Sequence, residues 1–370
     1  MKSFLPILFL ALSSPIFAQL NSKSIQVGAD SRDYVEYIPT NYQNSEASPL
    51  VIILHGIGGT ASDYATYGLN GIADTARFLP VYLQGEVNGF GQTAWNNGTL
   101  LGTTANDLAF IENIIDTMAV DYNIDRSRVY VVGISMGAIM TYKVLHHLSD
   151  KVAAAVCHIG TMSSDELANY NPSLPRPLMQ VHGINDAVVP YSGNALPSLG
   201  LVPETLVKLK AVNGWNGDST ISNIPNTAID DVTIEKIVYD CTTPLEHWKM
   251  SGAGAGHIFL FEPINDTSSM EITWHFLRDF SHPNPTLSIS THISPAINKL
   301  EVYPNPTQHT FSIQNPANFT YIKLYSIHQK LILETAEIGL IDVSELESGL
   351  YILMATDFNG QSHSRIITKQ

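Results

Sequence analysis

The stretch "VYVVGISMGAIM", from Val129 to Met140, places a serine between two glycines where a β-branched run gives way to a helical pattern. Gly133, Ser135 and Gly137 form the pattern G-x-S-x-G. After a strand and before a helix, this pattern is typical of a sharp turn that presents a nucleophilic serine, and side chains at the two glycines would collide with neighbouring backbone. The alternative is a serine that only caps the helix. The order of strand, turn and helix favours the nucleophile.

A serine is a weak nucleophile by itself, so the hypothesis requires a carboxylate and then a histidine further along the chain. Asp186 follows the apolar segment "PLMQVH", and His257 lies in the glycine-rich segment "SGAGAGHIF". Loops at the carboxyl ends of neighbouring parallel strands open on one rim of a sheet. We therefore expect Ser135, Asp186 and His257 to meet there. The alternatives are a turn-forming aspartate and a solvated loop histidine.

Other acids and histidines are weaker candidates for these two positions. Asp218, Asp230 and Asp231 lie in a polar stretch in which no preceding strand is predicted. His146 and His147 fall within the helix that follows the serine. Neither group has the position that the chain order requires.

The tetrahedral intermediate that a nucleophilic serine forms also needs backbone N–H groups that bind its oxyanion. One is expected from Met136, directly after the serine, and the second from Ile57, in the loop "HGIGG". His55, at the end of the preceding strand, is expected to brace this loop by hydrogen bonding rather than to act as a second base. Trp95, in "GQTAWNNG", is a candidate to line the acyl pocket, with a packed loop tryptophan as the equal alternative.

Short apolar runs alternate with amphipathic segments from Leu50 to about Phe280, which predicts an α/β domain with a mostly parallel sheet flanked by helices. In residues 106–122, apolar side chains should form one helical face that packs on the sheet: Leu108, Ile111, Ile115 and Met118. Segments 23–29 and 32–39 are predicted to open the sheet as antiparallel strands. The expected strands are "PLVIILH", "FLPVYLQ", "RVYVVGI", "KVAAAVCHI", "PLMQVH" and "LEHWKMS".

The two ends of the chain differ from this central pattern. Residues 1–18 combine Lys2 with a short apolar run and a terminal small residue, which predicts a cleaved secretory signal peptide. The catalytic domain is then expected over residues 19–280 and a proline-containing linker over 281–296. Residues 297–370 show short alternating strands separated by Pro, Asn and Gly turns, which predicts a small all-β sandwich.

Composition limits the partners of the chain. Of the 370 residues, 44% are hydrophobic and 14% charged, and the formal net charge is −15. A phosphate backbone requires clustered Lys and Arg, so a nucleic-acid partner is not expected. No segment of the mature chain is predicted to span a membrane. No metal or cofactor is expected, because the sequence shows no ligand cluster with familiar spacing. Cys157 and Cys241 either pair after export or remain free.

The chain resembles the α/β-hydrolase esterases that include secreted feruloyl esterases, acetyl-xylan esterases and polyhydroxybutyrate depolymerases. The resemblance covers about Ser24 to Phe280 and is carried by "PLVIILHGIGGTASDY", "AWN", "YNIDRSRVYVVGISMGAIM" and "GAGAGH". It implies triad positions for Ser135, Asp186 and His257, and oxyanion-hole positions for Ile57 and Met136. Ala138 replaces a second glycine, and "IFLF" replaces a Trp-Pro pair after the histidine, which changes the wall beside the leaving group.

The C-terminal unit is similar to the sorting domain of type IX secretion cargo. "VYPNPT", "IKLYSIHQKLI", "IDVSELESGLYIL" and the basic ending "RIITKQ" carry this resemblance. It implies that the type IX secretion machinery is a partner and that the protein is secreted or held at the cell surface. The alternative is a carbohydrate-binding or spacer module.

Together these patterns predict a secreted serine carboxylic-ester hydrolase that forms an acyl-enzyme. Feruloyl or acetyl esters of plant polysaccharides are the favoured substrates. A polyester depolymerase, a short-chain esterase or a peptidase of the same fold is the alternative among enzymes. A catalytically silent secreted binding protein is the alternative from another class.

Overall fold

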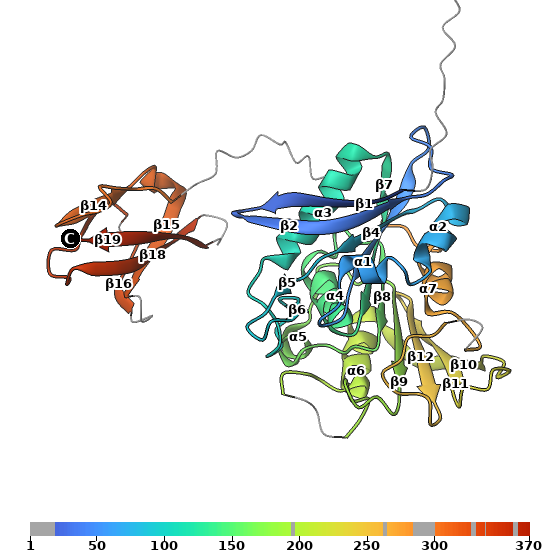
Figure 1. Ribbon diagram of the computed structural model, residues 1–370. Coiled ribbons are helices and arrows are strands. Elements are labelled where there is room, and N and C mark those ends of the chain that lie inside the picture. Colours follow the sequence, from blue (N-terminus) through green and yellow to red (C-terminus); the bar gives the residue numbers. More distant parts are fainter. Residues whose placement is uncertain are drawn as a thin grey trace, which may run out of the picture. The chain divides into compact units, whose positions relative to one another are not determined.

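The computed structural model describes residues 19–193, 197–261, 265–283, 300–326, 331–336, 338–357 and 362–370. The chain forms two compact units, residues 1–288 and 289–370 (Figure 1). The predicted signal peptide and most of the predicted linker lie outside the described residues. The start of that linker, however, is part of the first unit, because the buried His282 donates its N–H to the carbonyl of Ser127.

A ten-stranded mixed sheet forms the centre of the first unit, in the order β1-β2-β4-β3-β7-β8-β9-β12-β11-β10. The six strands from β4 to β12 run parallel, and antiparallel hairpins extend the sheet at both edges. The strands are β1 (Gln19–Val27), β2 (Asp30–Ile38), β3 (Ser48–Leu54), β4 (Leu79–Leu83), β7 (Ile124–Ile134), β8 (Ala154–His158), β9 (Leu178–Gly183), β10 (Trp215–Asn223), β11 (Thr233–Cys241) and β12 (Leu245–Ser251). A separate short pair is formed by β5 (Glu86–Val87) and β6 (Thr93–Ala94).

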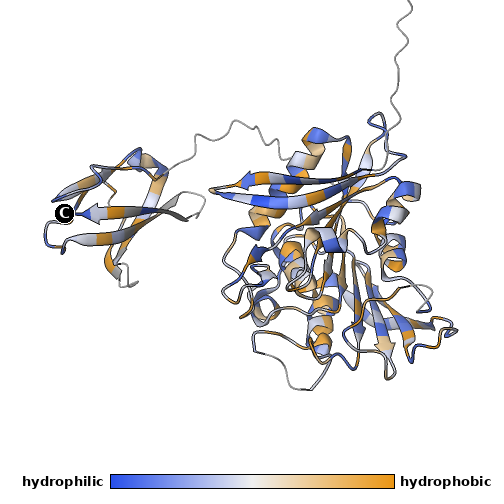
Figure 2. Ribbon diagram, in the orientation of Figure 1, coloured by the Kyte–Doolittle hydropathy of each residue, from blue (hydrophilic) through white to orange (hydrophobic). Residues whose placement is uncertain are grey.

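Helices cover both faces of this sheet, and Figure 2 shows hydrophobic and hydrophilic residues mixed along each of them. They are α1 (Ala61–Tyr64), α2 (Leu69–Ala76), α3 (Asp107–Asp121), α4 (Met136–His147), α5 (Ser164–Asn169), α6 (Val202–Asn213) and α7 (Ser269–Leu277). No helix in the described part of the chain is both long enough and apolar enough to cross a bilayer. The mostly parallel sheet flanked by helices agrees with the predicted fold class.

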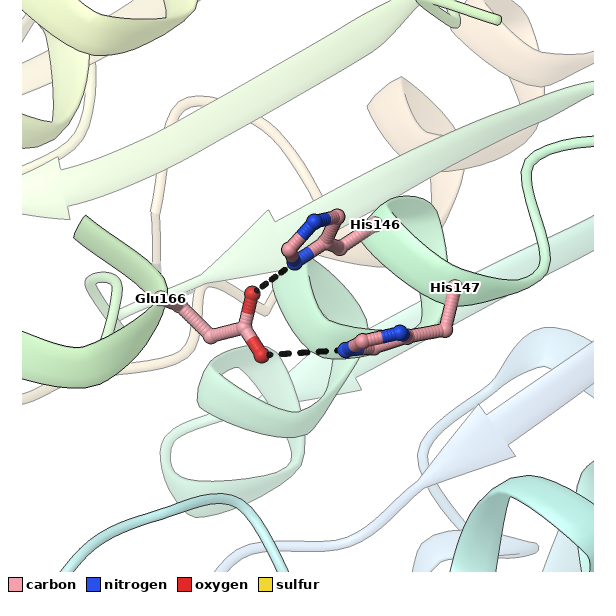
Figure 3. A group of neighbouring side chains, drawn as sticks. All are labelled: His146, His147 and Glu166. Atoms are coloured by element: carbon pink, nitrogen blue, oxygen red, sulfur yellow. Dashed lines mark hydrogen bonds and ion pairs between the residues drawn. The ribbon is translucent and has the colours of Figure 1, made fainter. Parts of the chain in front are cut away.

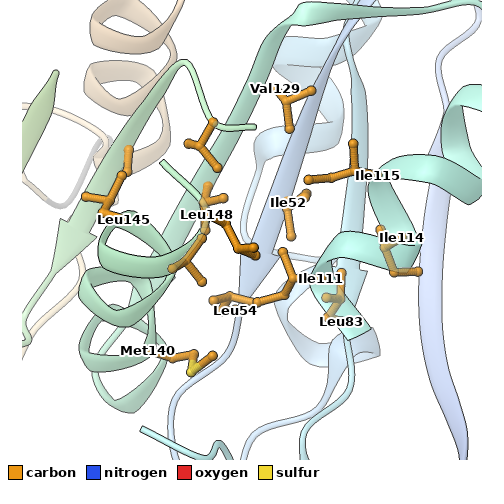
Figure 4. Close-up of a cluster of buried hydrophobic side chains, with 14 of the residues drawn as sticks. Ile52, Leu54, Leu83, Ile111, Ile114, Ile115, Val129, Met140, Leu145 and Leu148 are labelled. Atoms are coloured by element: carbon orange, nitrogen blue, oxygen red, sulfur yellow. The ribbon is translucent and has the colours of Figure 1, made fainter. Parts of the chain in front are cut away.

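Successive side chains of β3 point to opposite faces and enter two separate hydrophobic cores. Ile52 and Leu54 pack with α3 and α4 (Figure 4), whereas Val51 and Ile53 pack with α2 and α7. Burying a side chain of this size contributes about 1.5–3 kcal/mol to the free energy of unfolding. The central strands are therefore fixed from both sides, and loops at their carboxyl ends are held on a rigid support.

The predicted apolar face of α3 is largely correct. Ile111, Ile115 and Met118 are buried, while Leu108 is only partly buried. Phe110 and Ile114 complete the buried face in its place.

Cys157 and Cys241 are both free thiols. Cys157 is buried in β8, with Sγ 3.7 Å from the carbonyl oxygen of Ala138.

The second unit contains two small antiparallel sheets around their own core, as predicted for an all-β unit. One sheet has the strand order β13-β14-β17 and the other β16-β15-β18-β19. The strands are β13 (Val302–Tyr303), β14 (Thr310–Ile313), β15 (Phe319–Ser326), β16 (Leu331–Thr335), β17 (Leu340–Asp342), β18 (Gly349–Asp357) and β19 (Ser362–Lys369). A 3₁₀ helix, η1 (Pro316–Asn318), precedes β15.

Candidate active site

Ser135 occupies the turn between β7 and α4 with φ 56° and ψ −118°, a conformation that non-glycine residues rarely adopt. Its N–H donates to the carbonyl of His158 at 2.8 Å, which holds the turn against β8. A Cβ on Gly133 would lie 2.2 Å from the carbonyl oxygen of Gly137, and one on Gly137 would lie 2.0 Å from that of Leu54. Backbone therefore fills the space beside both glycines, as the sequence pattern predicted.

His257 lies in the loop after β12 and contacts both other residues of the predicted triad. Its Nε2 is 3.0 Å from Oγ of Ser135, and its Nδ1 is 2.7 Å from Oδ2 of Asp186. An ionised carboxylate can only accept a hydrogen bond, so Nδ1 carries the proton and Nε2 presents its lone pair to the serine hydroxyl. This is the tautomer that a general base requires.

Asp186 follows β9, and its carboxylate is completely buried. Oδ1 accepts the N–H groups of Val188 and Val189, both at 2.8 Å, while Oδ2 faces His257 and also lies 3.2 Å from Nε2 of His182. Burial alone would raise the pKa of Asp186. Hydrogen bonds from His182, His257 and the Val189 N–H outweigh burial and hold the pKa far below its usual range.

His182 was not among the residues predicted from the sequence. It is buried at the end of β9, and its Nε2 lies 2.9 Å from the carbonyl oxygen of Val189 as well as near Asp186. Because a carbonyl only accepts, Nε2 must carry the proton and donate to both oxygens. The sequence signal that could have indicated this role is the position of His182, at the end of a strand and four residues before Asp186.

The glycine-rich loop that carries His257 packs closely on two neighbours. A Cβ on Gly183 would lie 2.3 Å from the carbonyl oxygen of Ala255, and the N–H of Gly254 donates to the carbonyl of Asp231. In the following segment "IFLF", Leu260 is buried and Phe259 packs against the rings of Tyr67 and His158, whereas Phe261 is 39% exposed.

The loop after β3 lies directly beside the serine. A Cβ on Gly56 would be 3.2 Å from Cβ of Ser135, and Ile57, Ser135 and Met136 line one cavity. The N–H groups on either side of Ile57 are used within the fold: Gly56 donates to the hydroxyl of Tyr64, and Gly58 donates to the carbonyl of Thr93.

His55 braces this loop, as predicted. It donates from Nδ1 to the carbonyl of Gly56 at 2.7 Å and accepts the N–H of Gly85 at Nε2 at 2.9 Å. Burial lowers the pKa of His55, which favours the neutral form that makes both bonds.

The prediction that Trp95 lines the acyl pocket is wrong. The side chain is fully buried, its Nε1 donates to the carbonyl of His55, and its ring packs on the His55 ring at 4.9 Å. The polar loop sequence around Trp95 concealed this burial, because the neighbouring polar groups bond within the fold. Trp95 therefore packs behind the loop that carries Ile57 and supports it.

The cavity in front of Ser135 has a volume of about 310 Å³ and is mostly apolar. Leu100 and Val188, which are 71% and 53% exposed, lie on its outer wall. The lining residues are Ile57, Thr99, Leu100, Leu101, Ser135, Met136, Ile139, Val188, Val189, Pro197, Ser198 and Leu199.

Two of the rival acids, Asp230 and Asp218, have other surroundings. Asp230 accepts hydrogen bonds from Asn265 and from the N–H of Val232, and Asp218 lies in the exposed strand β10. The expectation that no strand precedes Asp230 and Asp231 is wrong, since β10 does so. The residue bonded to Nδ1 of His257 is nevertheless Asp186.

Two protein-family models match the chain. Residues 101–198 match the family described as Phospholipase/Carboxylesterase, and residues 301–369 match the Secretion system C-terminal sorting domain. The second match covers nearly all of the small β unit.

Several relatives with curated names are esterases. Feruloyl esterase B of Piromyces equi is 30% identical over 267 residues, which cover 68% of this chain and 46% of that protein. A bifunctional acetylxylan esterase/xylanase of Neocallimastix patriciarum is 33% identical over 174 residues, which cover 46% of this chain and 24% of that protein. The chain therefore spans less than half the length of either relative.

Among solved structures, an acetyl xylan esterase from Aspergillus awamori has a TM-score of 0.50 and 16% identity, and the match covers 70% of this chain and 99% of that one. At this identity the match shows the fold alone, and that fold is the predicted α/β-hydrolase arrangement. The predicted similarities to esterases and to a secretion sorting domain are both confirmed.

Proposed function

We propose that this protein is a serine hydrolase of carboxylic esters. The observation that carries the proposal is the bridging position of His257, with Nε2 at 3.0 Å from Ser135 Oγ and Nδ1 at 2.7 Å from a buried Asp186 oxygen. A serine that only capped a helix would need neither contact, and the side chain of Ser135 makes no capping hydrogen bond to α4.

In the proposed reaction, Oγ of Ser135 attacks the ester carbonyl while Nε2 of His257 removes the hydroxyl proton. The backbone N–H groups of Ile57 and Met136 bind the oxyanion of the tetrahedral intermediate. His257 then donates the proton to the departing alcohol, which leaves an acyl group on Ser135. Water, activated by the same histidine, hydrolyses this acyl-enzyme. Asp186 keeps the imidazole in the required tautomer and stabilises its protonated form.

Esters on plant polysaccharides, feruloyl or acetyl, are the proposed substrates. The names of the two relatives support this class, and the apolar walls of the cavity suit an aromatic acyl group better than a charged one. Methyl ferulate and acetylated xylan should therefore be compared with polyhydroxybutyrate as a polyester control. An apolar pocket distinguishes one methylene by about 1–3 kcal/mol, so the comparison requires ratios of kcat/KM.

The decisive test for enzyme against silent binding protein is hydrolysis of p-nitrophenyl acetate by the purified chain and by Ser135→Ala. The purified chain should hydrolyse this ester, whereas Ser135→Ala should show no hydrolysis above background. Both should unfold at the same temperature. Absence of turnover by the natural chain on this ester and on all the polymer substrates would contradict it.

We also propose that the protein is exported and that the β unit directs it to the type IX machinery. The match of residues 301–369 to a secretion sorting domain supports this. In a host with that machinery, removal of residues 297–370 should stop release while the remaining chain still hydrolyses esters. Release at the full rate would contradict the sorting role.

A further inference from the structure

Three potential metal ligands lie together at the end of α4, far from the serine. His146 and His147 are the last two residues of this helix, and Glu166 lies in the first turn of α5 (Figure 3). The sequence did not predict this cluster, because the 18 residues between His147 and Glu166 leave no familiar ligand spacing. Contact between the two helices brings the three side chains together.

The ligand atoms are close enough for one ion. Nδ1 of His146 is 2.7 Å from Oε2 of Glu166, Nε2 of His147 is 3.6 Å from Oε1, and all three ligand atoms lie within 4.8 Å of one another. Zinc binds histidine nitrogen and carboxylate oxygen at about 2.0–2.2 Å, so its tetrahedral ligands are separated by roughly 3.4 Å. The present separations between the three ligand atoms range from 2.7 Å to at most 4.8 Å, and small side-chain rotations would bring them to this value.

The surroundings hold the ligands in place. The N–H of Glu166 donates to the buried Ser163 hydroxyl at 3.2 Å, which fixes the first turn of α5. The ring of His146 packs against those of His147 and Tyr170, with centroid distances of 4.3 and 5.5 Å.

Charge also favours a cation here. The Glu166 side chain is 5% exposed, and its carboxylate is the one anionic ligand of the three. The C-terminus of α4 adds the negative end of a helix dipole. The His147 side chain is 44% exposed, so an ion has a path from solvent and room for water as a further ligand.

We propose that His146, His147 and Glu166 bind one zinc ion that ties the end of α4 to α5. Mixed nitrogen and oxygen ligands favour zinc over magnesium and calcium, which prefer oxygen alone. Ser135 is at the opposite end of this twelve-residue helix, about 18 Å away at 1.5 Å per residue, so the ion is structural and independent of the proposed ester hydrolysis.

The test is zinc titration by calorimetry on tag-free full chain after treatment with a chelator, together with thermal unfolding with and without zinc. One ion per chain and a higher Tm are expected. Loss of even a hydrogen-bond partner of a ligand typically weakens metal affinity about 10- to 100-fold, so His147→Ala should weaken binding at least as much. His275→Ala is the matched control, because His275 is an exposed histidine in the last turn of α7.

Visible absorption of bound cobalt(II) provides a second measurement that does not depend on stability, and His147→Gln provides a second variant. Both variants should lose the cobalt spectrum, while His275→Ala and His257→Ala should keep it. Undetectable zinc binding by the natural chain, unchanged binding by both His147 variants, or loss of the ion in His257→Ala would each overturn the proposal.

Discussion

Nδ1 of His257 lies 2.7 Å from Oδ2 of Asp186, although the two residues are 71 positions apart in the chain. The contact depends on the order of the sheet, in which β9 and β12 are parallel neighbours with Gly183 paired to Met250. The loops that leave these strands therefore begin side by side. The helix α6 and the hairpin β10–β11 occupy the sequence between them without separating them in space.

Asp186→Asn should abolish most ester hydrolysis while the chain remains folded. An amide can donate to Nδ1 of His257 and so stabilise the wrong tautomer, a change that reduces kcat about 10⁴-fold in a serine triad. Asp231→Asn is the control, because its backbone carbonyl rather than its side chain contacts the Gly254 N–H of the histidine loop. Steady-state kinetics on p-nitrophenyl acetate measure the activity of both variants. A larger loss in the Asp231 variant would show that the acid is assigned to the wrong residue.

His182→Leu should lower kcat without a matching change in KM. It removes a hydrogen bond to the Asp186 carboxylate, and a bond to a charged group contributes about 1.5–3 kcal/mol, which corresponds to roughly 10- to 100-fold in rate. His182→Gln keeps an N–H near the position of Nε2 and should recover most of the rate. If the two variants are equally impaired, His182 acts through packing and does not position Asp186.

Gly137→Ala should prevent formation of the serine turn. The added Cβ would lie 2.0 Å from the carbonyl oxygen of Leu54, and a backbone atom of a central strand cannot move aside. Both activity and the yield of folded protein should fall. Ala138→Gly, one residue later in the same helix, should retain activity at a cost of about 0.5–1 kcal/mol in the free energy of unfolding. Comparable losses in the two variants would show that general helix weakening, not the clash, is responsible.

Stability should decrease as the pH falls below about 6.5. Burial lowers the pKa values of His158 and His247 to about 3. Between about pH 6.5 and 3 the unfolded chain binds protons at these sites and the folded chain does not, so each histidine removes up to about 1.4 kcal/mol of stability per pH unit.

Urea unfolding at pH 5, 6 and 7 measures this dependence. His158→Gln keeps a polar atom near the Thr273 hydroxyl, which lies 2.7 Å from Nε2 of His158, and removes the titrating group. In this variant the slope of the free energy of unfolding against pH should be smaller by about 1.4 kcal/mol per pH unit. An unchanged slope would show that His158 is not the group that takes up the proton on unfolding.

The features that the sequence predicted correctly depend on local pattern. Apolar runs such as that of β3 define the central strands, and the G-x-S-x-G turn before α4 defines the position of Ser135, whatever surrounds them. Strands β10 and β11 were both missed. The sequence of β10, "WNGDSTISN", is exposed throughout and lacks alternating apolar residues. Its partner β11 fixes it through the backbone, and the sequence carries no signal for that pairing.

The site residues that were missed or misplaced depend on tertiary contacts. The role of His182 could be predicted only by knowing that Val189 and Asp186 fold back over the end of β9. Trp95 is buried beside His55, which lies 40 positions earlier in the chain and accepts the Trp95 Nε1–H at its backbone carbonyl. The cluster at the end of α4 requires α5 to cross beside it. In each case the pattern around the residue resembles that of an ordinary loop or surface residue.

Covalent labelling with a fluorophosphonate tests the central claim most directly, because the reagent reacts with a serine only when a neighbouring base activates it. Peptide mass spectrometry of the full chain should find a single phosphonyl group on Ser135, acquired in step with the loss of ester hydrolysis. Ser135→Ala and His257→Ala should remain unlabelled. Complete loss of activity with the label on another residue, or full hydrolysis by a chain already phosphonylated at Ser135, would contradict the account.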